Sequence, residues 1–146
     1  MEKIISQIFA ATALISTLSE DRLPAVLHDD HRAMLIPLIR NTMLNIATKM
    51  LPVIDDIDIS DTDVAITFNP AIAKAGLSSR IDALVEQACA YHVLAIAFDE
   101  ASPGHAAHFR TVAEASVDMA LEITSFITAG GGCGNPRALR IRPHIF

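Results

Sequence analysis

Aromatic and basic side chains are scarce in this chain. It has no tryptophan and one tyrosine, so it lacks the aromatic platforms on which single-stranded nucleic acids stack. Eleven lysines and arginines stand against seventeen aspartates and glutamates, and the net charge of -6 has the wrong sign for binding a phosphate backbone. Only two cysteines, Cys89 and Cys133, are present, which excludes a disulfide-rich scaffold and is more typical of reduced thiols than of a single bridge.

Catalytic motifs are missing as well. The chain has no Gly-x-Ser-x-Gly elbow, and neither cysteine has the sequence context of a nucleophile paired with a histidine. The glycine-rich segment 130–134 follows a helical pattern and lacks the Lys-Ser/Thr of a phosphate-binding loop. We therefore predict a protein that is not an enzyme and that uses no cofactor.

Length and composition indicate one domain. The chain has 146 residues, of which 51% are apolar, enough to bury a core without a metal or a disulfide. Glu2 offsets the charge of Lys3, and polar residues interrupt the apolar run that follows, which does not fit a secretory signal. No run reaches the ~18 to 20 uninterrupted apolar residues of a membrane span. We expect a soluble protein that is made in the cytoplasm and does not enter a membrane.

Two helices are expected in the first third of the chain. Residues 3–18 carry apolar side chains at spacings of three and four, which predicts an amphipathic helix. A second helix is expected after a capping Asp29 or Asp30. Pro37 predicts either a kink in this helix or a start near residue 36. The apolar face of the second helix comprises Leu35, Ile39, Met43, Ile46 and Met50.

Two longer helices are expected in the second half. One is capped by Ser78 or Ser79 and runs to about Phe98, and the other starts at Ser102-Pro103 and runs to about Thr128. We expect them to form an antiparallel hairpin that holds the centre of the core. The predicted core residues are Leu84, Ala88, Leu94, Val112, Met119 and Ile123.

The segment between the two helical regions is acidic. Val64–Phe68 has the alternation and the β-branched residues of a strand, and Asn69-Pro70 is expected to stop it. A single short strand is unstable, so it needs a partner in this chain or in a neighbour. The preceding residues fit a calcium loop poorly, because Asp61 and Thr67 stand where glycine and glutamate are required. We predict a solvated acidic loop, or an acidic patch for a basic partner, that contains Asp55, Asp56, Asp58, Asp61 and Asp63.

Histidines offer the one alternative chemistry. His105 and His108 are three residues apart on a predicted helix, and His92 with nearby carboxylates would approach them in a helical hairpin. This arrangement is the basis of an alternative hypothesis, a helical-bundle metal protein or enzyme. A core histidine is the commoner role for His92, and no Glu-x-x-His pair of a di-iron site occurs. The segment His28–His31 also consists of histidines and aspartates, which can ligate a metal. The side chains of adjacent residues point in different directions, however, so the start of a helix is the simpler interpretation.

The C-terminal segment has a distinctive pattern. Glycines at 130–132 and 134 form a joint, and residues 133–146 are expected to form an extended arm behind a domain of residues 1–132. Basic and apolar side chains then alternate with a period of two, as in a strand with one buried face. The arm is expected either to pair within its own chain or to bind an adjacent copy. Its predicted binding residues are Arg137, Leu139, Arg140, Ile141, Arg142, Ile145 and Phe146.

The order of these parts resembles small virion assembly proteins of tailed phages and prophages, especially head–tail connector and completion proteins. The similarity covers residues 30–146 and includes the passage Ala90–Phe109, with Ser102-Pro103 between two helices. It implies a ring-forming homo-oligomer without enzymatic activity, with portal or tail proteins as partners and the virion as its location. Together, sequence and resemblance predict a mainly α fold: a four-helix domain with one short β element and an extended C-terminal arm.

Overall fold

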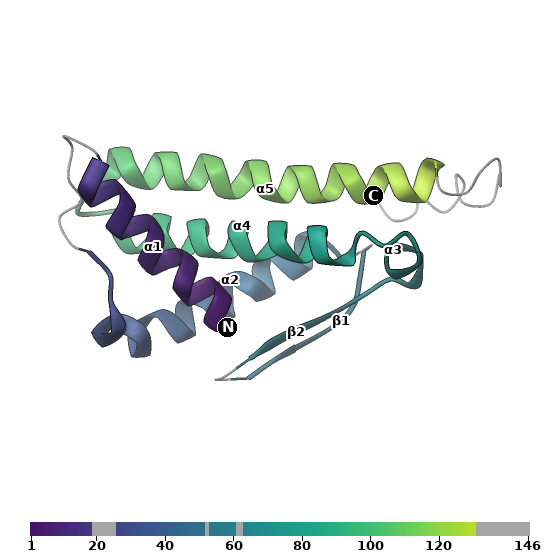
Figure 1. The fold of residues 1–146 in the computed structure, drawn as a ribbon, viewed down its shortest axis with the longest axis horizontal. Helices are drawn as coiled ribbons and strands as arrows, with labels where there is room; N and C mark the ends of the chain where they lie inside the picture. The colour runs from purple at the N-terminus through teal and green to yellow at the C-terminus, as the bar shows by residue number, and fades with distance from the viewer. Residues whose placement is uncertain (19–25, 52, 61–62, 131–146) are drawn as a thin grey trace.

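The computed structural model describes residues 1–18, 26–51, 53–60 and 63–130, and the fold is mainly helical with a short two-stranded element (Figure 1). The predicted fold class is confirmed for this part of the chain. The C-terminal arm, residues 133–146, lies outside the described residues.

The N-terminal half contains two long helices. Helix α1 spans Glu2–Leu18 and helix α2 spans Arg32–Lys49. All five predicted apolar positions of α2 are buried. Pro37 lies inside α2, so the helix does not start near residue 36. A 3-10 turn, Asp29–His31, precedes it.

The acidic segment forms a strand, which corrects the prediction of a loop. Strand β1, Ile54–Ile59, pairs antiparallel with strand β2, Val64–Phe68. The predicted strand therefore has its partner in the same chain. Period-two alternation explains the result, because Ile57 and Ile59 share one face with the apolar residues of β2 and pack against the core, whereas the aspartates between them point away.

A short helix that the sequence did not suggest follows β2. Helix α3 spans Pro70–Lys74, and the side chain of Asn69 caps it by accepting a hydrogen bond from the backbone N–H of Ala71 at 2.9 Å. Asn69-Pro70 thus ends the strand and also starts a helix, with asparagine at the N-cap and proline in the first turn.

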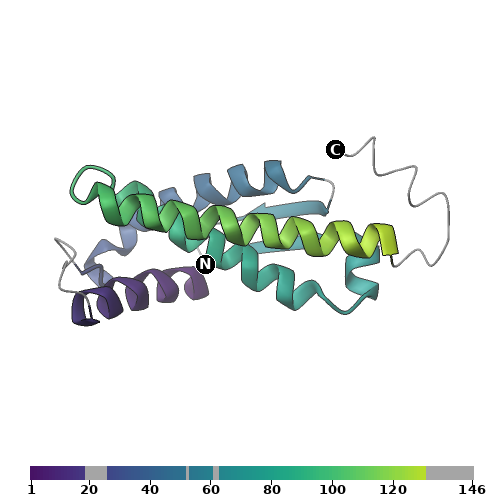
Figure 2. The ribbon, with the colours of Figure 1, turned by 90° about the horizontal axis from the view of Figure 1, so that it is seen from above.

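Helix α4, Ser78–Phe98, is the central helix. Helix α5, Pro103–Gly130, packs along one side of it, and α1 and α2 pack on the other side (Figures 1 and 2). Helix α4 begins at Ser78, but the predicted cap by Ser78 or Ser79 is wrong, because Leu77 is the N-cap residue and no side chain caps the helix. By length and hydropathy α4 would also pass as a membrane span. Half of that stretch is buried among three other helices, which accounts for its apolar composition.

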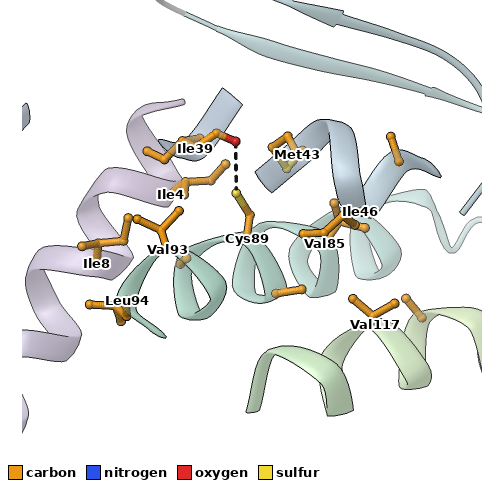
Figure 3. Close-up of a cluster of buried hydrophobic side chains, with 14 of the residues drawn as sticks. Ile4, Ile8, Ile39, Met43, Ile46, Val85, Cys89, Val93, Leu94 and Val117 are labelled. Carbon is orange, nitrogen blue, oxygen red and sulfur yellow. Dashed lines mark hydrogen bonds between the residues drawn. The ribbon is translucent and has the colours of Figure 1, made fainter. Parts of the chain in front are cut away.

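The core lies where α4 meets its neighbours (Figure 3). Of the predicted core residues, Ala88 and Leu94 are fully buried, and Leu84, Val112 and Ile123 are half-buried. Met119 is 47% exposed, so its assignment to the core is wrong. Helix α5 instead faces α4 through mostly small side chains, which let two helices approach closely, and Met119 lies outside this face. Its buried residues are Ala106, Phe109, Ala113, Ser116, Val117, Ala120 and Thr124.

Candidate functional site

The β-hairpin has one acidic face. Asp56 lies opposite Thr67 and Asp58 lies opposite Ala65, and all four side chains are exposed. Because Asp56 and Asp58 are two residues apart on a strand, their carboxylates point to the same side. Within the described part of the chain neither carboxylate has an ion-pair partner. The hairpin therefore presents two adjacent, unneutralised negative charges to solvent.

The other aspartates of the predicted acidic patch have different roles. Asp55 is exposed at an irregularity in the pairing of β1. Asp63 supports the hairpin turn, since its carboxylate accepts a hydrogen bond from the N–H of Val64 at 2.9 Å and lies 3.8 Å from the buried N-terminal ammonium of Met1. Asp61 lies outside the described residues. The patch is thus centred on Asp56 and Asp58.

The outer edge of β1 is open. The sheet has two strands, so each strand has one edge that no described segment pairs with. Backbone bonding alternates along an antiparallel pair, and the Ser60 N–H donates to the Asp63 carbonyl at 2.9 Å. Ser60 therefore directs its backbone N–H and C=O groups toward β2, and so do Asp58 and Asp56, which are two and four residues before it. The residues between them, Ile59 and Ile57, direct their backbone groups outward. An open edge with exposed polar groups is a template for another strand.

A second unoccupied surface lies on α2, and the sequence analysis did not identify it. Opposite the buried face, six positions at alternating spacings of three and four form one line along the helix and just past its end. Met34 is 48% exposed, Leu44 47% and Leu51 67%. None of the six is charged, and we call this surface the α2 stripe. Its residues are Met34, Pro37, Asn41, Leu44, Thr48 and Leu51. The spacing was visible in the sequence, but the stronger apolar face of α2 concealed it.

Two histidines of the alternative hypothesis, His105 and His108, lie in the first two turns of α5, whereas His92 lies within α4. His105 forms a 2.7 Å hydrogen bond with Ser102. The rings of His105 and His108 both pack near the ring of Phe109, with distances between ring centroids of 6.4 and 6.3 Å. Burial lowers the pKa of His92, with smaller effects from nearby charges that include Lys49. Among the residues that the structure describes, no three His, Cys, Asp or Glu side chains are grouped to hold a metal ion.

His28 and His31 close the entrance to α2. The His28 ring accepts a hydrogen bond from the N–H of Asp30 at 3.4 Å, and the His31 ring accepts one from the N–H of His28 at 3.1 Å. This reciprocal cap closes the 3-10 turn Asp29–His31, and α2 itself has no side-chain cap, so the predicted aspartate cap of α2 is wrong. Asp29 instead binds the guanidinium of Arg32 at 3.1 Å. The four-residue cluster is thus a helix entrance.

The predicted binding residues of the arm, from Arg137 to Phe146, lie outside the described residues, as does Cys133. No family model, curated protein or solved structure matches this chain. Function has to be inferred from the hairpin, the α2 stripe and the sequence of the arm.

Proposed function

We propose that this chain is a non-enzymatic structural subunit that forms an oligomeric ring through its C-terminal arm. The layout that resembles head–tail connector proteins supports a role in the neck of a tailed phage or prophage virion, with portal or tail proteins as neighbours. Such a subunit is made in the host cytoplasm and ends in the virion. It needs surfaces that match other subunits and no reactive centre.

The α2 stripe is the observation that carries this proposal. Large apolar side chains that line up on one exposed helix face, without a charge among them, are characteristic of protein–protein contacts rather than of a solvated surface. Three of the exposed large hydrophobic residues of the described chain, Met34, Leu44 and Leu51, lie on this line. A monomer gains nothing from such a surface, whereas an assembly subunit buries it.

The charge distribution supports contact between arm and body. The arm has three arginines and no acidic residue, so of the net charge of -6 the remaining residues 1–132 carry -9. Opposite charges on two parts of one molecule favour contact between copies and set its register, while the apolar anchors supply more of the affinity. Contacts between unlike surfaces of successive copies close into rings when the rotation permits.

The test is the mass of the purified full-length chain, measured by light scattering over a range of concentrations. We expect a discrete oligomer of the 15.7 kDa chain. Leu139→Glu with Ile141→Glu in the arm, and Leu44→Glu with Leu51→Glu on the α2 stripe, should each reduce it to smaller species with unchanged circular dichroism. Ile96→Glu is the matched control, because Ile96 is 52% exposed on α4 and away from the stripe.

A full-length chain that stays monomeric at all concentrations would refute the proposal. If the oligomer forms both in the arm variant and in a chain that lacks residues 133–146, the ring does not depend on the arm. Electron microscopy of the oligomer then distinguishes a closed ring from an open filament.

A further inference from the structure

We infer that the acceptor of the arm is the open edge of β1 in an adjacent copy, which the segment Leu139–Arg142 extends as a third, antiparallel strand. The inference rests on the proposed function and specifies the surface that it uses. Three observations lead to it: the edge is open, its side chains alternate in the same way as those of the arm, and its charges are opposite.

The alternation defines a register. In an antiparallel pair, side chains directly opposite each other lie on the same face. Ile59 opposite Leu139 and Ile57 opposite Ile141 place the apolar residues together on the face that packs toward the core. These are also the two positions of β1 whose backbone N–H and C=O groups point outward, so they can bond a new strand.

The same register pairs the charges. Asp58 then lies opposite Arg140 and Asp56 lies opposite Arg142, on the exposed face of the hairpin. Both carboxylates are exposed, and neither has an ion-pair partner in the described chain. Pro143, which has no N–H to donate, falls next to the irregularity at Asp55 where regular pairing already stops.

The opposite edge of the hairpin fits the arm less well. A strand added to β2 would place its outward side chains opposite Ala65 and Thr67, which are uncharged. Arg140 and Arg142 would then be one strand removed from the aspartates. The positions of the charges therefore favour the edge of β1 over the edge of β2 as the acceptor of the arm.

The direction of the strands favours a second copy. Helix α5 packs against α3, which directly follows β2, so the described chain ends toward the base of the hairpin (Figure 1). A strand antiparallel to β1 has to enter at the hairpin tip. Strand β1 has six residues and is about 20 Å long, and the eight residues 131–138 span at most about 28 Å. After reaching the tip, about two of them would remain for a reversal, fewer than a β-turn uses. The arm of another copy approaches the tip without this reversal.

Charge reversal in the full-length chain tests the pairing. One variant carries Arg140→Asp and Arg142→Asp, and another carries Asp56→Arg and Asp58→Arg. We expect each to lose assembly alone, and a chain with all four changes to assemble again. A matched control for the hairpin variant, Asp118→Arg with Glu122→Arg on the exposed face of α5, changes the net charge by the same amount as that variant and should assemble as the parent does.

Mixing the two reversed variants tests whether the contact joins different copies. The native arm of the hairpin-reversed chain matches the native hairpin of the arm-reversed chain, and the reversed arm matches the reversed hairpin. Both contacts between unlike copies are therefore productive, and the mixture should assemble with the two variants alternating although neither variant assembles alone. Hydrogen exchange at the amides of Ile57 and Ile59 should slow in that mixture.

Three outcomes would overturn the inference. If the hairpin-reversed chain assembles normally while the arm-reversed chain does not, β1 is not the acceptor, and the proposed function stands. If the four-change chain assembles but the mixture stays monomeric, the arm pairs within its own chain. If the parent chain itself never assembles, the proposed function and this inference both fail.

Discussion

The backbone N–H of Leu27 donates a hydrogen bond to the hydroxyl of Thr12 at 3.1 Å, and this buried bond joins α1 to the segment that leads into α2. The hydroxyl also donates to the carbonyl of Phe9 at 3.0 Å, so it serves as acceptor and donor at once. Thr12 has no exposed surface. A polar side chain on the inner face of an apolar helix therefore satisfies a backbone group that water does not reach.

Thr12→Val should destabilise the fold by about 1–3 kcal/mol, because valine keeps the shape but leaves the Leu27 N–H buried without a partner. Thr12→Ser is the matched control, since serine keeps the hydroxyl and loses one methyl group, at a cost of roughly 0.8 kcal/mol. Urea denaturation of both variants gives the comparison. An equal or larger loss for Thr12→Ser would show that packing, not the hydrogen bond, makes Thr12 important.

The limits of sequence-based prediction are clear in α2 and α5. The large apolar residues of the buried α2 face were predicted correctly because large aliphatic side chains repeat at helical spacing, which is a local property. In α5 the large residues Val112, Met119 and Ile123 suggested that their side of the helix faces the core. The side that packs against α4 is instead the neighbouring one, which carries mostly small residues such as alanine. Alanine gives a weak hydrophobic signal, and only the close fit to α4 makes it the contact surface.

Leu94→Ala should therefore lower the free energy of unfolding by about 2–5 kcal/mol, whereas Met119→Ala should change it by less than about 0.5 kcal/mol. Leu94 is fully buried in α4, and Met119 is 47% exposed on α5. Thermal or urea unfolding measures both. A large loss for Met119→Ala in a dilute monomeric sample would contradict the orientation of α5.

The candidate site was predictable in part. The acidic segment was correctly identified, but it was assigned to a loop because aspartate is rare in strands. Pairing with β2 depends on residues further along the chain, such as Ala65 opposite Asp58, seven positions away, and a local pattern does not encode that contact strongly. The histidine cap of the 3-10 turn before α2 was missed because aspartate is the usual capping residue, and an imidazole acceptor at that place is uncommon.

Cys89 should make stability fall at alkaline pH. Its thiol donates to the carbonyl of Ile39 at 3.7 Å (Figure 3), and burial raises its pKa from the ordinary value of 9.0 to about 12. The unfolded chain therefore releases this proton at a lower pH than the folded chain. The effect is absent below pH 9 and grows as the pH rises toward 12.

At pH 10 the loss should reach about 1 kcal/mol in the parent. Cys89→Ala removes this titration, so the difference between the two pH profiles from pH 8 to 10 isolates it from other groups. In a Cys133→Ser background, Cys89 should also react with thiol reagents only at the rate of unfolding. Rapid labelling of the native protein at pH 8 would show that Cys89 is not buried.

Pro37→Ala should stabilise the isolated chain. Pro37 lies inside α2, where it has no N–H to donate to the carbonyl four residues earlier, and its side chain is exposed. Proline is about 3 kcal/mol less favourable than alanine inside a helix, but it also restricts the unfolded chain by about 0.4–1 kcal/mol. We therefore expect a net gain of about 2–2.6 kcal/mol for the monomer in urea denaturation.

The same change should weaken assembly, because Pro37 belongs to the α2 stripe and shapes the backbone that carries Met34 and Leu44. A residue that costs monomer stability at an exposed position fits a surface adapted to contact rather than to folding. Asn41→Ala is the matched control for a neutral change on the stripe without a backbone effect. If Pro37→Ala stabilises the chain and leaves the oligomer unchanged in light scattering, the shape of α2 at Pro37 plays no part in the contact.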